Sequence, residues 1–111
     1  MKAENFKIEH IEKILEFYQL YVGPVNLKYL HLNSILEDIK SNYASDGYRI
    51  GSKWTAHSKL VFRIDYSNRE IIPTFNPNFD PKDRNSKTYE EAQKAGELFK
   101  KKSLEYLSSN T

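Results

Sequence analysis

Five basic side chains lie close together in the sequence and have the strongest capacity for chemistry. They are Arg49, Lys53, His57, Lys59 and Arg63, and all five positions carry odd numbers. Guanidinium and ammonium groups donate hydrogen bonds to phosphate oxygens, so a row of them can bind a nucleic-acid backbone or an acidic partner. This basic row is therefore the candidate binding site.

His57 is the one member of the basic row that could also move a proton. A histidine beside a cation can act as a general base on a scissile phosphate, as in metal-independent ribonucleases. No carboxylate stands at a spacing that would orient the ring, because Asp65 is eight residues farther along the same predicted strand. We therefore predict a binding role for His57, with ribonuclease activity as a lower-ranked alternative.

The sequence predicts no catalytic residue, metal site or cofactor. The chain has no cysteine, and none of its three histidines has acidic neighbours at a ligand spacing. Its four glycines are scattered, so they form no phosphate-binding loop. The net charge is only +2, which does not by itself indicate nucleic-acid binding. The excess of basic over acidic residues falls within residues 43–75, around the basic row.

Alternation of apolar and polar residues predicts a strand over about residues 54–66. Leu60, Phe62 and Ile64 would face the core, and the odd-numbered positions would face the opposite side. A turn at Asp46–Gly47 predicts a short preceding strand at about residues 47–51. The basic row therefore belongs to the sheet face that the core does not use.

Ser67–Asn68 predicts a hairpin loop that leads into a third strand at about residues 69–75. Closing the hairpin there makes the apolar positions of both strands coincide, so the turn and the hydrophobic pattern agree on one register. Pro73 lacks an amide proton and belongs on an edge strand, which places residues 54–66 in the middle of a three-stranded antiparallel meander. The predicted pairs are Leu60 with Phe75, Val61 with Thr74, Phe62 with Pro73, Arg63 with Ile72 and Ile64 with Ile71.

Two helices are predicted before the sheet. Apolar residues recur every three or four positions over about residues 6–22, and Gly23–Pro24 ends that helix. A second helix is predicted over about residues 34–43, with a capping box from Ser34 to Glu37. Residues 25–32 fit a short helix or a strand, and we favour a helix.

One helix is predicted after the sheet. Residues 76–87 are rich in proline and asparagine and predict a surface loop. A capping box from Thr88 to Glu91 opens a helix over about residues 88–107, whose small residues would pack on one sheet face. The whole chain, residues 1–111, is thus predicted to be a single α+β domain with N-terminal helices, a three-stranded meander and a C-terminal helix.

These features predict a small non-enzymatic protein that binds nucleic acid through the basic sheet face and the loop at residues 76–85. The alternative is a protein-interaction module, such as a phage-type inhibitor or an immunity-like protein, which binds through some of its eight tyrosines and six phenylalanines. No apolar run is long enough to span a membrane, so a cytoplasmic protein is expected. The many asparagine, lysine, isoleucine and tyrosine residues are typical of small bacterial or phage genes. The sequence does not choose between DNA and RNA, nor does it fix the oligomeric state.

Overall fold

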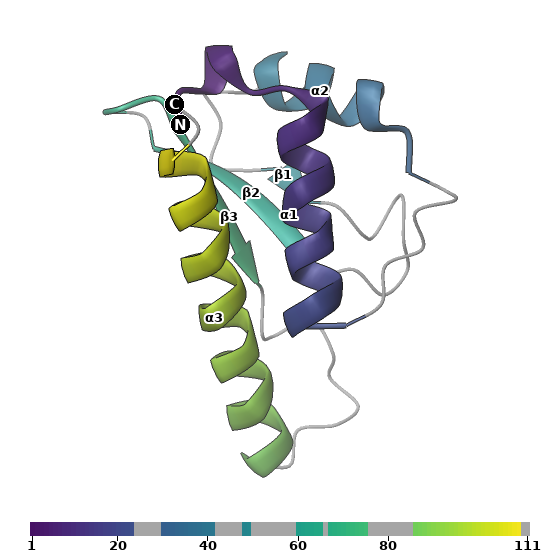
Figure 1. The fold of residues 1–111 in the computed structure, drawn as a ribbon, viewed down its shortest axis with the longest axis vertical. Helices are drawn as coiled ribbons and strands as arrows, with labels where there is room; N and C mark the ends of the chain where they lie inside the picture. Colours follow the sequence, from purple (N-terminus) through teal and green to yellow (C-terminus); the bar gives the residue numbers. More distant parts are fainter. Residues whose placement is uncertain (24–29, 42–47, 50–59, 66, 76–85, 110–111) are drawn as a thin grey trace.

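Two antiparallel helices lie side by side over one face of a small sheet in the computed structural model of the chain (Figure 1). The structure describes residues 1–23, 30–41, 48–49, 60–65, 67–75 and 86–109. The α+β class predicted from the sequence is confirmed. In chain order the elements are the 3-10 helix η1 (Ala3–Asn5), α1 (Ile8–Tyr21), α2 (Leu32–Ser41), β1 (Tyr48–Arg49), β2 (Leu60–Asp65), β3 (Glu70–Phe75) and α3 (Ser86–Ser109).

The antiparallel pairing of β2 with β3 has the predicted register. Leu60 pairs with Phe75, Phe62 with Pro73, and Ile64 with Ile71. The register could be predicted because a shift of one residue would turn every apolar side chain of β2 away from the core. The two residues of β1 pair antiparallel with the other edge of β2, so the strand order is β1-β2-β3. The predicted strand residues 54–59 and the predicted loop residues 76–85 lie outside the described part of the chain.

The turn between β2 and β3 includes Arg69, which was predicted to be the first residue of the third strand. The pairing ends at Asp65 and Glu70, and Arg69 has a φ of 53° in the left-handed region. The Asp65 carboxylate closes the turn by accepting hydrogen bonds from the Ser67 amide at 3.0 Å and the Asn68 side-chain amide at 3.0 Å. These bonds, above all those from Asn68, hold the pKa of the Asp65 carboxyl below its ordinary value, so the group stays ionised at neutral pH.

Helices α2 and α3 both begin two residues before their predicted starts. Ser34 and Thr88 are therefore the third residues of their helices, and the predicted capping boxes are wrong. In α2 the Ile35 amide donates to the His31 carbonyl at 3.0 Å, so the first helical turn already includes Ser34. At its other end, α3 continues to Ser109, two residues beyond the predicted limit.

The N-terminal segment extends the sheet beyond β3, which the sequence pattern did not indicate. The Ala3 amide donates to the Arg69 carbonyl at 2.7 Å, and the Ile71 amide donates to the Met1 carbonyl at 3.1 Å. Lys2 forms an antiparallel bridge with Glu70. This part of the β3 edge is therefore covered by the chain itself, which satisfies its backbone groups.

The core lies between the two-helix layer and the inner face of the sheet. The rings of Phe6 and Phe62 pack edge-to-face with centroids 5.8 Å apart, and those of Tyr18 and Phe99 do the same at 5.4 Å. Such edge-to-face pairs stabilise packing beyond the area that they bury. Among the described residues, the apolar ones with no exposed surface are Phe6, Ile11, Ile14, Ile35, Ile39, Leu60, Phe62, Ile71, Phe99 and Leu107.

His10 is a polar residue inside this core. Its ring stacks on Phe6 at a centroid distance of 5.7 Å, and its Nδ1 accepts a hydrogen bond from the Lys7 amide at 2.9 Å. That bond satisfies a backbone donor at the start of α1. Burial lowers the pKa of His10, Glu9 opposes this effect, and the charges of Lys7 and the N-terminus add to it. The folded protein therefore favours the neutral ring.

We expect the free energy of unfolding to fall as the pH decreases below about 6.5, the ordinary pKa of histidine. The unfolded chain takes up a proton on His10 at a higher pH than the folded chain, so acid favours unfolding. Urea denaturation at pH 7.5 and pH 5.5 measures this loss. His10→Gln keeps a side-chain acceptor but does not titrate, so it should reduce the difference in unfolding free energy between the two pH values. If that difference were the same in the variant as in the parent protein, the role of His10 would be contradicted.

Candidate functional site

The structure describes two of the five residues in the basic row. Arg49 lies in β1 and Arg63 lies in β2. Lys53, His57 and Lys59 lie outside the described residues. The geometry of the candidate site is therefore built from the two arginine positions and the strands that carry them.

The strand register brings the two arginine positions to the same face of the sheet. Arg49 pairs with Val61, and Arg63 is two residues farther along β2. Positions related in this diagonal way are typically about 7–8 Å apart, within reach of one extended ligand. Both positions lie opposite the face on which Phe62 is fully buried. Arg63 itself is exposed.

The sheet face that contains the positions of Arg49 and Arg63 is called the outer sheet face. Arg63 has an apolar neighbour on it. Arg63 pairs directly with Ile72 of β3, which is half-buried, and the half-buried Thr74 follows on the same strand. An exposed guanidinium beside an apolar side chain can contact a ligand that has both an anionic part and an apolar part.

Two acidic residues occupy the hairpin end of the same face. Asp65 pairs with Glu70, and the Asp65 carboxylate is held by the turn. Lys2 bridges to Glu70, and its charge also lowers the pKa of the Asp65 carboxyl, so charges of both signs meet at the hairpin end. On β2 itself, the exposed basic residue of this face is Arg63, two residues before Asp65.

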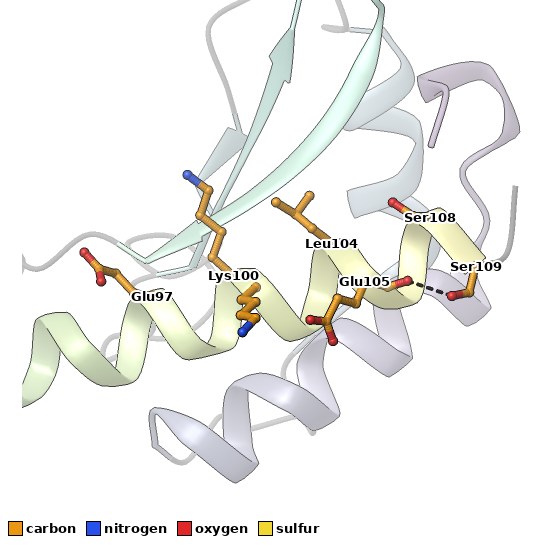
Figure 2. Close-up of a pocket in the computed structure, with 7 residues that line it drawn as sticks. Glu97, Lys100, Leu104, Glu105, Ser108 and Ser109 are labelled. Atoms are coloured by element: carbon orange, nitrogen blue, oxygen red, sulfur yellow. Dashed lines mark hydrogen bonds between the residues drawn. The ribbon is translucent and has the colours of Figure 1, made fainter.

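A shallow hollow runs along the outer face of α3. Figure 2 shows Leu104 directed toward the strands and the Glu105 carboxylate on the side of α1. Two lysines and two glutamates line the hollow, so no charge dominates it: Lys100, Lys101, Glu97 and Glu105. The Ser109 hydroxyl donates to the Glu105 carbonyl at 2.9 Å, within the helix itself. The hollow thus offers no set of groups that converge on a ligand.

The described residues provide no evident catalytic group. Ser103 is fully buried and its hydroxyl has no hydrogen-bond partner, so it is neither accessible nor activated as a nucleophile. Burial raises the pKa of the Tyr106 phenol, which keeps it protonated. Within the described part of the chain, no three acidic or histidine side chains are placed to hold a metal ion.

The described aromatic rings mostly serve packing. Phe6, Tyr18, Phe62 and Phe99 are buried, whereas Phe17 is half-buried. Among the described residues, the large apolar side chains that are exposed are two leucines: Leu20 on α1 is 71% exposed and Leu98 on α3 is 41% exposed. Sequence reasoning missed both leucines, although each departs from the apolar stripe of its helix and a helical projection would have shown it.

None of the helices in the described ranges is long and apolar enough to cross a membrane. Comparison of the chain with protein-family models, curated proteins and solved structures found no match.

Proposed function

We propose that this protein binds nucleic acid, without catalysis, through the outer face of its sheet. The observation that carries the proposal is the register, which places Arg49 and Arg63 on one face, with the half-buried Ile72 beside Arg63. Lys53, His57 and Lys59 share the odd-numbered positions of the same sequence pattern and would extend the surface. Arginine suits this role because its planar group donates to phosphate and stacks on bases.

The salt dependence of binding tests the proposal. Each phosphate contact releases counterions, so the logarithm of the association constant should fall linearly with the logarithm of salt concentration. Arg49→Ala combined with Arg63→Ala should reduce the magnitude of this slope by about two on duplex DNA, or about one and a half on a single strand. Fluorescence anisotropy with a labelled DNA duplex, a single-stranded DNA and an RNA hairpin measures the slope.

A matched control separates local contacts from total charge. Lys40→Ala combined with Lys94→Ala removes two positive charges from exposed positions on α2 and α3. This control should leave the salt slope nearly unchanged. Equal slopes for both double variants, or no binding by the parent protein to any of the three probes, would contradict the proposal.

A second candidate function is binding to a protein partner through the outer surface of α1 and α3. The exposure of Leu20 and Leu98 favours it, because exposed apolar side chains that lie close together often mark an interface. This surface and the outer sheet face belong to different layers of the molecule, so the two functions are compatible.

A further inference from the structure

The two exposed leucines lie at the same height on neighbouring helices. Helices α1 and α3 run antiparallel (Figure 1), and the contact between Tyr18 and Phe99 fixes their relative position. Leu20 is two residues after Tyr18, and Leu98 is one residue before Phe99. Since an α-helix rises about 1.5 Å per residue, the two leucines differ in height by about one residue.

At two further levels along the helix axes, a charged residue of α1 lies level with a residue of opposite charge on α3. Glu16 is two residues before Tyr18, and Lys102 is three residues after Phe99. One turn farther along, Lys13 matches Glu105 by the same count. Within each helix the charges also pair: Lys13 with Glu16 at 3.2 Å and Lys102 with Glu105 at 3.9 Å.

These side chains share the solvent side of the two-helix layer. Phe17 and Tyr106 meet at the junction of the helices, with ring centroids 6.1 Å apart. At about 100° per residue, the three α1 residues lie roughly 40–100° from Phe17, on the side away from the core, and the three α3 residues bear the same relation to Tyr106. We call this set the outer helical surface; it consists of Lys13, Glu16, Leu20, Leu98, Lys102 and Glu105.

We propose that the outer helical surface binds a second copy of this chain. The proposal rests on the second candidate function, protein binding, and not on nucleic-acid binding. A two-fold axis parallel to the helices would place α1 of each copy on α3 of the other. Leu20 then meets the partner's Leu98, Lys13 meets the partner's Glu105, and Glu16 meets the partner's Lys102.

Charge complementarity identifies a second copy as the occupant. The surface carries two lysines and two glutamates, so it would not attract an anionic or a cationic partner as a whole. A copy of itself, however, presents a glutamate wherever this surface presents a lysine. Each contact occurs twice because of the symmetry. Two leucines per copy and exposed ion pairs stabilise weakly, so we expect half-dissociation at roughly 10–100 µM protein.

Two charge-reversal variants test the arrangement directly. Lys13→Glu alone places like charges opposite each other twice in the dimer, and Glu105→Lys alone does the same. In an equimolar mixture, one copy of each variant restores attraction at both contacts. Sedimentation equilibrium of the full chain up to about 1 mM should show a dimer for the parent, monomers for each variant alone, and a dimer for the mixture.

The controls separate association from folding. Gln19→Glu adds a negative charge at an exposed α1 position outside this surface and should leave the dimer intact. Leu20→Ala combined with Leu98→Ala should weaken dimerisation about tenfold or more, while the thermal midpoint of a dilute sample, below 5 µM, changes only slightly.

Three results would contradict the inference. They are a monomeric parent at 1 mM, a dimer that survives Lys13→Glu alone, and a mixture that associates no better than its separate components. A monomeric parent protein at 1 mM would mean that this surface does not bind a second copy. Binding of a different protein would then be tested by pull-down, with Leu20→Ala as the negative control. None of the three changes the expected salt slope of the Arg49 and Arg63 variant, so this failure is distinguishable from failure of nucleic-acid binding.

Discussion

Phe62→Ala is expected to lower the free energy of unfolding by about 3–5 kcal/mol. The Phe62 ring has no exposed surface, contacts the Phe6 ring edge-on at 5.8 Å and stands opposite Pro73 at the centre of the sheet. Truncation removes the ring and leaves a cavity that strands on both sides prevent from closing. Urea denaturation followed by circular dichroism measures the loss.

The neighbouring residue provides the control for Phe62. Arg63 is exposed on the opposite face, so Arg63→Ala should change the free energy of unfolding by about 0.5 kcal/mol or less. A large loss of unfolding free energy at Phe62 beside a small loss at Arg63 is expected only if the two residues face opposite sides of the sheet. Similar losses for both variants would contradict the assignment of Phe62 to the inner face.

Phe99→Ala should be about equally destabilising, by about 3–5 kcal/mol. Phe99 is fully buried and its ring meets Tyr18 edge-on, so it joins α3 to α1. Loss of the ring would remove both the buried area and the contact that sets the relative height of the helices. The change in denaturation midpoint is again the measurement.

Leu98→Ala is the matched control for Phe99, because Leu98 is the preceding residue and is 41% exposed. At protein concentrations below 5 µM it should cost about 0.5 kcal/mol or less. A loss for Leu98→Ala as large as that for Phe99→Ala would mean that α3 packs through a different face. It would then also remove the basis for the outer helical surface.

The sequence was most informative where two independent patterns agreed. The register of β2 and β3 follows both from the alternation around Phe62 and from the turn near Asn68, and either pattern alone would have allowed a slip. The helix starts were predicted less well, because a serine or threonine followed by glutamate also occurs inside a helix. Ser34 is such a case.

Long-range contacts account for the features that sequence patterns did not reveal. The pairing of Lys2 with Glu70 joins residues from opposite parts of the chain and carries no local periodicity. The burial of His10 depends on Phe6 and on Tyr106, which belongs to α3. By contrast, the pairing of Arg63 with Ile72 was predicted from the hairpin register, and the structure adds that Ile72 is half-buried.

The most direct test of the account is to map where nucleic acid contacts the protein. Isotope-labelled protein would be titrated with a short DNA duplex and an RNA hairpin, and amide chemical shifts would be followed by NMR. We predict that the largest shifts occur at outer-face positions of the sheet, including Arg49, Arg63 and Ile72, with little change at Leu20 and Leu98. Shifts confined to α1 and α3, or no shifts with either ligand, would contradict nucleic-acid binding by the outer sheet face.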